Sequence, residues 1–262
     1  MILTDAQIGA WLGQLLWPLF RIGSFFMVIP IIGTRLVSMR IRMGLALAVT
    51  VIVAPLLDPV PVVEALSVDA VFITLQQILI GSLLGFMFVM LMQLFVVAGQ
   101  MIAMQMGLGF ASMVDPANGV NVPVLSQIFL VGVTLVFLAM NGHLVMIEVI
   151  VESFRTWPVS ATIVGPGSIT LVHVWEMVMR VSWMFASALI LSLPVITAVL
   201  IVNLSFGIMT RAAPQMNVFS LGFPIGMLFG LFIIWVSVPG LLPQFEKLSL
   251  ETFLYLRELQ GG

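Results

Sequence analysis

The chain contains no cysteine and very little charge, and both shortages restrict what it can be. Charged residues make up 8% of its 262 residues and hydrophobic residues 61%, whereas an ordinary soluble domain has roughly 25% charged residues. Without cysteine there is no disulfide, no thiol nucleophile and no Cys-ligated zinc. The composition therefore excludes a water-soluble monomer.

Basic residues are also too few to form a nucleic-acid-binding surface. Nine Lys and Arg residues stand against eleven Asp and Glu residues, for a net charge of -2, and binding to a phosphate backbone needs clustered positive charge. Residues 1–10 include Asp5 and no Lys or Arg, unlike the basic start of a cleavable signal peptide. We expect no nucleic acid partner, and we expect the first apolar segment to stay in the mature protein.

Known enzyme motifs are lacking as well. The sequence has no HExxH metal motif, no Gly-x-Ser-x-Gly nucleophile motif and no Walker phosphate loop. His173 and Glu176 are one helical turn apart, and His143 and Glu148 are the other possible ligands, but a metal site needs a denser ligand cluster. We therefore expect no enzyme activity, no metal and no cofactor.

Long apolar segments dominate the rest of the chain. About 20 apolar residues suffice for a helix to cross a hydrocarbon layer about 30 Å thick. The charge-free run from Ala70 to Val114 has 45 residues and would be about 68 Å long as one helix, so we expect it to break. The sequence predicts an all-α polytopic membrane protein with about six hydrophobic helices, at 8–32, 43–57, 71–97, 123–150, 172–200 and 217–242.

We expect a single domain over 1–262 that ends in an amphipathic helix at 243–262. Three sets of glycines recur at four-residue spacing and so lie on one helix face: Gly9 with Gly13, Gly81 with Gly85, and Gly222 with Gly226 and Gly230. Small residues let helices approach closely in lipid, so these faces predict tight packing within the chain or with partner chains. Pro194 predicts a kink in the fifth helix.

Ionisable residues inside apolar segments are costly and are functional candidates by default. Five qualify, namely Arg21, Glu148, Glu152, Glu176 and Arg180. Glu176 and Arg180 are one turn apart, so they can neutralise each other. Structural pairing, or a position near the membrane interface, is the interpretation we favour for these residues.

The segment 100–119 differs from the other apolar segments. Gly107, Gly109, Pro116 and Gly119 interrupt it, and irregular backbone at membrane depth survives only where protein buries it or where it lines an aqueous cavity. Its methionines, Met101, Met104, Met106 and Met113, are adaptable apolar side chains. Two interpretations stay open: a gate or plug, or a Met-rich core helix followed by a turn. Asp115 either caps the next helix or lies in a pore.

Four stretches in order resemble one family. They are Gln105-Met-Gly-Leu-Gly-Phe-Ala-Ser-Met-Val-Asp-Pro116, Phe137-Leu-Ala-Met-Asn-Gly-His143, Leu193-Pro-Val-Ile196, and Arg211-Ala-Ala-Pro-Gln-Met-Asn-Val-Phe219 with Gly222-Phe-Pro224. Each alone is a weak signal, but all four at these spacings resemble the FliR family of the flagellar type III secretion export gate. The resemblance covers nearly the whole chain, and the equivalent injectisome subunits are similar.

The resemblance implies a non-enzymatic subunit of the bacterial inner membrane, in the flagellar basal body. It implies assembly with FliP and FliQ, close to FlhB, into a channel for unfolded flagellar proteins, and contact with membrane lipid. The implied fold is a FliP-like part joined to a FliQ-like part. The family's pore plug maps onto loop 106–121, with Phe110 projecting towards the channel.

Two groups of site residues follow from the Met-rich segment, the glycine spacing and this mapping. The plug or gate comprises Met104, Met106, Gly107, Gly109, Phe110, Met113, Asp115 and Pro116. The helix packing and assembly group comprises Gly81, Gly85, Arg211, Pro214, Asn217, Gly222, Gly226 and Gly230.

The alternative function is a proton-coupled secondary transporter that uses Asp115 in a broken helix and Glu148 in a helix, since such proteins place acids at discontinuous helices. A transporter would work as a monomer or homodimer. The very few buried charges, and the lack of a visible internal repeat, count against it.

Overall fold

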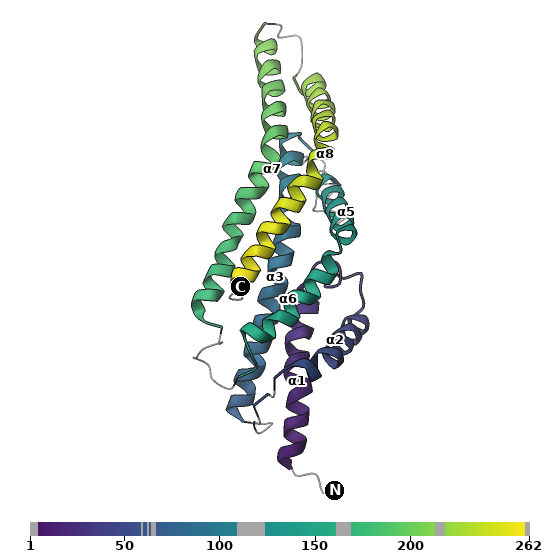
Figure 1. The fold of residues 1–262 in the computed structure, drawn as a ribbon. Helices are drawn as coiled ribbons and strands as arrows, with labels where there is room; N and C mark the ends of the chain where they lie inside the picture. Colours follow the sequence, from purple (N-terminus) through teal and green to yellow (C-terminus); the bar gives the residue numbers. More distant parts are fainter. Residues whose placement is uncertain are drawn as a thin grey trace. The chain divides into compact units, whose positions relative to one another are not determined.

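The computed structural model describes residues 5–58, 60–61, 63, 67–108, 124–160, 169–212 and 218–259, without the side chains of 5–12, 212, 218–221 and 223 (Figure 1). All regular structure in these residues is helical, which confirms the all-α class. The elements are α1 Asp5–Val28, α2 Met39–Val53, the 3₁₀ turn η1 Ala54–Leu56, α3 Val68–Gln105, α5 Val124–Ala139, α6 Gly142–Thr156, α7 Leu171–Ala212 and α8 Val218–Leu259.

The apolar runs of the sequence form the long helices. In the part of the chain that the structure describes, four stretches are long and apolar enough to cross a membrane, and α5 with α6 makes a fifth if the two count as one broken span. The four are Met39–Leu56, Val68–Gln105, Leu171–Arg211 and Pro224–Leu259. Helix α1, which we expected to span as 8–32, is not among them, because Gln14 and Arg21 lower its hydropathy.

Prolines near the C-terminus do not end the last helix. We expected a helix to end at 242 and a separate amphipathic helix to begin at Pro243, but α8 runs from Val218 to Leu259 through Pro224, Pro239 and Pro243. In apolar surroundings the backbone N–H and C=O groups of the non-proline residues find hydrogen-bond partners only within the helix. Continuing the helix past the prolines therefore costs less free energy than ending it. The segment 243–259 is therefore the last part of α8.

The predicted helix at 123–150 is two helices. The break falls at Asn141, which has a φ of 58°, a left-handed conformation that Asn adopts more readily than most residues. The Leu144 N–H donates to the Asn141 carbonyl over 2.9 Å and so begins α6. The Asn141-Gly142 pair in the sequence is a turn signal, and it marks this break.

The chain divides into two compact units. The first comprises Met1–Met90, Met140–Arg180 and Glu251–Gly262, and the second comprises Leu91–Ala139 and Val181–Leu250. In the first unit α1 packs against α3, where the rings of Phe25 and Phe88 meet edge to face with their centroids 6.0 Å apart. Both rings are fully buried, so this contact belongs to the core of the unit.

In the second unit one ring joins three helices. Phe245 of α8 lies with its ring centroid 5.6 Å from that of Phe95 in α3 and 6.4 Å from that of Phe137 in α5. All three rings are buried. Aromatic pairs at these spacings add to the stabilisation that burial alone gives.

Burial is very unequal among the long helices. Within the chain, 67% of the most apolar stretch of α3 is buried, against 22% in α7 and 11% in α8. Helix α3 is therefore a core helix. The apolar side chains that α7 and α8 leave exposed suit contact with lipid or with partner subunits.

Candidate functional site

The C-terminal end of α3 carries the first residues of the predicted plug. Two backbone hydrogen bonds cap the C-terminus of α3. The Gly107 N–H donates to the Met104 carbonyl over 3.1 Å, and the Leu108 N–H donates to the Ala103 carbonyl over 2.9 Å. Gly107 has a φ of 80°, which suits glycine and few other residues. This pattern is a Schellman cap. Gly107 thus fixes the point at which the chain leaves α3.

Met106, one residue earlier, lies against the glycine face of α8. A Cβ atom placed on Gly230 would come within 2.7 to 2.8 Å of three atoms of the Met106 side chain. Met106 is 2% exposed, whereas Met104 is 70% exposed. The structure therefore brings together one residue of the plug group and one of the assembly group.

Seven residues of these two groups lie outside the described residues. Gly109, Phe110, Met113, Asp115 and Pro116 lie outside them, as do Pro214 and Asn217. Arg211 is exposed at the end of α7. The gate thus stays a prediction, with only its start at Met104, Met106 and Gly107 described.

The glycine face of α8 lies towards helices of the same unit. Gly222, Gly226 and Gly230 are all buried. A Cβ on Gly226 would lie 3.4 Å from the side-chain oxygen of Asn203 in α7, which is an ordinary contact distance. Gly230 is therefore more closely packed than Gly226, and its lack of a side chain leaves room for Met106.

Gly81 and Gly85 lie on the face of α3 that meets α1. A Cβ on Gly81 would overlap the carbonyl oxygen of Arg21 and the hydroxyl of Ser24, and a Cβ on Gly85 would lie 3.0 Å from Cβ of Val28. The two glycines let the backbones of α1 and α3, which meet inside the first unit, approach each other closely.

Arg21 joins three helices at this contact. Its Nε donates to Oε1 of Gln77 in α3 over 2.7 Å, its Nη1 donates to the Ser153 carbonyl of α6 over 2.9 Å, and its Nη2 donates to the Trp157 carbonyl over 2.7 Å. The guanidinium also lies 4.1 Å from the ring centroid of Phe154. Arg21 and Gln77 have no exposed surface. These hydrogen bonds and the full burial of Arg21 favour a structural role for this residue over a functional one.

Sequence reasoning did not find the partners of Arg21, and it also missed Gly99. A Cβ on Gly99 would lie 2.9 Å from Cα of Ser126 in α5, so this glycine sets the distance between α3 and α5. No spacing signal marks it, because Gly99 has no second glycine four residues away.

Of the other ionisable candidates, Glu148 and Glu152 lie on exposed faces of α6, whereas the Arg180 side chain in α7 is only 17% exposed. Glu148 is exposed on α6, and Glu152 pairs with Arg155 over 3.2 Å on the surface. Arg180 pairs with Glu251, 3.9 Å away, and stacks on Tyr255. Among the residues that the structure describes, no three His, Cys, Asp or Glu side chains are grouped as metal ligands.

The contact between Met106 and Gly230 makes a first prediction. In Gly230→Ala the added methyl group displaces the flexible Met106 side chain, which costs about 1 kcal/mol and raises the oxidation rate of Met106 by peroxide about fivefold. Mass spectrometry of the purified full-length chain measures this rate, with exposed Met104 as the internal reference. Gly226→Ala, one turn away, is the control. Unchanged oxidation of Met106 in Gly230→Ala would contradict the contact.

Comparison with known proteins gives the family. A family model described as bacterial export proteins, family 1, matches residues 12–252. The chain is 36% identical over 256 residues to flagellar biosynthetic protein FliR of Escherichia coli (strain K12), covering 98% of this chain and 96% of that protein. It is 34% identical over 250 residues to the FliR protein of Pectobacterium carotovorum subsp. carotovorum, covering 95% and 93%.

A more distant relative gives the same result. The chain is 30% identical over 244 residues to flagellar biosynthetic protein FliR of Bacillus subtilis (strain 168), covering 92% of this chain and 93% of that protein. Matches at this identity extend over nearly the full length, as the four sequence stretches led us to expect. The chain therefore belongs to the FliR family of bacterial export proteins.

Proposed function

We propose that this chain is a structural and gating subunit of the flagellar type III protein export gate. Family membership and the apolar helices make it a membrane-embedded component of a flagellar export apparatus. The finer proposal is that it forms, with FliP and FliQ and next to FlhB, the channel for unfolded flagellar proteins. The channel lies in the bacterial inner membrane, at the flagellar basal body.

The observation that carries the gating proposal is the end of α3. The Gly107 cap and the contact of Met106 with Gly230 give the start of loop 106–121 a fixed base. A loop tied at such a base can move over a channel without unfolding the helix that carries it. This geometry supports a plug that opens by movement of the loop beyond Gly107.

Closure of the channel follows from the side chains of the loop. Phe110 and Met113 are apolar, and apolar groups at a constriction stop ions by dewetting it. Methionine adapts its shape to varied neighbours, so the same residues can close around passing chains of different sequence. No catalytic step is needed for this function.

Exposed apolar faces of α7 and α8 are the surfaces that we assign to partner subunits and lipid. In the second unit Leu200 and Ile201 of α7, and Leu228 and Phe232 of α8, are more than half exposed. Faces of this kind are unstable in water and need an apolar covering. We expect FliP, FliQ and lipid to provide it.

The transporter alternative gains no support from the described residues. It requires buried acids at a discontinuous helix. Glu148 is exposed on α6, and Asp115 lies outside the described residues. The export-gate proposal needs neither residue to carry protons.

Ion leakage tests the plug. In Phe110→Ala the loss of the large apolar side chain is expected to raise the ion conductance of the assembled complex, because a smaller side chain leaves a wetted gap. Planar bilayer recording with complexes purified from the membrane measures it. Phe72→Ala removes an exposed Phe of α3, far from the proposed plug in the sequence, and should leave the complex as ion-tight as the parent. If Phe110→Ala were equally ion-tight, and secretion unchanged, the plug assignment would be abandoned.

A further inference from the structure

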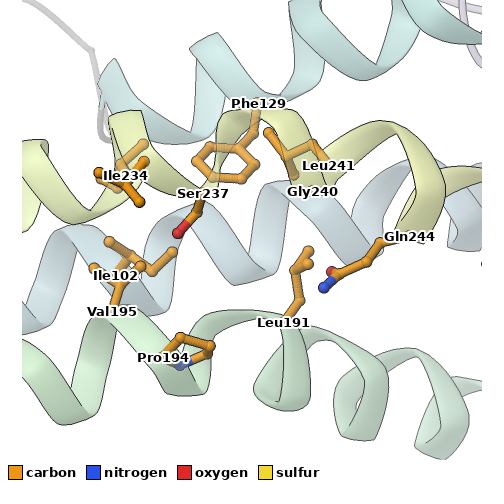
Figure 2. Close-up of a pocket in the computed structure, with 11 residues that line it drawn as sticks. Ile102, Phe129, Leu191, Pro194, Val195, Ile234, Ser237, Gly240, Leu241 and Gln244 are labelled. Carbon is orange, nitrogen blue, oxygen red and sulfur yellow. The ribbon is translucent and has the colours of Figure 1, made fainter.

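The second unit contains a cavity of about 260 Å³ between four of its helices (Figure 2). Ile102 of α3, Phe129 of α5 and Val195 of α7 form its floor and are all less than 9% exposed. Pro194 of α7 and Gly240 of α8 lie at its exposed rim. The cavity is therefore closed towards Ile102, Phe129 and Val195 and open to the outside of the unit at Pro194 and Gly240.

The lining of the cavity favours an apolar guest over water. Eleven residues line it, and Ser237 and Gln244 are the two with polar side chains. The Ser237 hydroxyl donates to the Ile233 carbonyl over 2.8 Å within α8, so its proton is not directed to a guest. A cavity lined by apolar groups stays dry and takes up apolar molecules of matching size.

One end of the cavity is polar. Ser237, Gly240, Gln244 and Lys247 follow one another on α8 at steps of three or four residues, which places them on one face of the helix. Gln244 lies at the rim, and Lys247, the single lysine of the chain, is exposed one turn further on. Glu246 is offset by one residue and faces another direction. The apolar cavity thus leads to an amide and an ammonium group.

We infer that this cavity binds one acyl chain of an anionic phospholipid, with the phosphate headgroup at Gln244 and Lys247. The acyl chain fills the space above Ile102 and Phe129, and the lysine attracts the negative headgroup. The site does not depend on loop 106–121, so this inference stands or falls separately from the gating proposal.

A photoreactive lipid tests the site. The full-length chain, purified with the proteins that accompany it, is placed in phosphatidylethanolamine nanodiscs with phosphatidylglycerol that carries a diazirine in mid-chain. Mass spectrometry then maps the labelled residues. Phe232 and Trp235, which are 54% and 71% exposed, report on ordinary lipid contact. Ile102 and Phe129 report on the cavity floor, and we expect them to be labelled as strongly as the exposed pair.

Two glycine variants make the matched comparison. A Cβ atom on Gly240 or on Gly207 of α7 would meet no atom within 4 Å, so neither position is crowded, and only Gly240 lies at the cavity. Gly240→Leu should lower labelling of the floor about tenfold, because leucine occupies the space of several methylene groups. Labelling of Phe232 and Trp235 should stay unchanged, and Gly207→Leu should behave as the parent.

The headgroup is tested with the exposed Lys247. Lys247→Gln should remove a preference of about fivefold for phosphatidylglycerol over phosphatidylcholine carrying the same diazirine. An unlabelled floor in the parent, or equal floor labelling in Gly240→Leu, would overturn the acyl site, and so would a co-purified protein cross-linked in place of the lipid. Equal labelling by both lipids in the parent would overturn the anionic headgroup.

Discussion

Replacing Arg21 with methionine is expected to lower the free energy of unfolding by about 2–6 kcal/mol, because two buried acceptors lose their donor at about 1–3 kcal/mol each. Methionine keeps much of the apolar volume but donates no hydrogen bond. Oε1 of Gln77 and the Trp157 carbonyl would lose the donors that Arg21 gives them in a fully buried position. The Ser153 carbonyl is less affected, because it also accepts the Trp157 N–H.

Thermal unfolding of the purified chain measures the loss, with an expected fall in Tm of roughly 10 °C for a chain of this size. Arg155→Met is the matched control. The Arg155 side chain is 81% exposed, and its ion pair with Glu152 lies on the surface, where such pairs contribute about 0–1 kcal/mol. Equal Tm values for the two variants would show that the Arg21 network does not hold α1, α3 and α6 together.

Gly81→Ala is the second substitution with a large expected effect. The new methyl group would overlap the Arg21 carbonyl oxygen and the Ser24 hydroxyl. The carbonyl is part of the α1 backbone, so it cannot move unless the whole helix shifts. Overpacking of this kind costs about 1–3 kcal/mol, and we expect the upper end of that range.

Gly23→Ala makes the comparison decisive. Gly23 is also a helical glycine, in α1, but an added Cβ there would meet no atom within 4 Å. Alanine should stabilise this position by up to about 1 kcal/mol, because it favours the helix more than glycine does. The two variants should therefore change the free energy of unfolding in opposite directions. If Gly81→Ala were as stable as Gly23→Ala, α1 and α3 would not be in close contact there.

Much of the helical architecture could be predicted from the apolar runs alone. Helix α3 is an instructive exception: we expected it to end near Val97, because the charge-free run is too long for one helix across a membrane, yet it continues to Gln105. Gly99 lies inside α3 without interrupting it, and it packs against Ser126 of α5. A glycine that breaks a helix and a glycine that packs one look alike in a single sequence.

The candidate site was only partly predictable. Met106 and Gly230 were both named from the sequence, but for different roles, and their contact depends on tertiary structure. The partners of Arg21 lie between 56 and 136 residues away along the chain, and no local pattern connects them. The four-residue glycine spacing, by contrast, is a property of helix geometry and is visible directly in the sequence.

The most direct test of the export-gate proposal uses the absence of cysteine from the chain. Phe110→Cys gives a protein with a single thiol in the proposed plug, and Leu204→Cys places one on the exposed face of α7. An exported flagellar protein that carries one cysteine and is arrested in transit should form a disulfide with position 110 and not with position 204. No disulfide at position 110, or equal disulfides at both positions, would contradict the account.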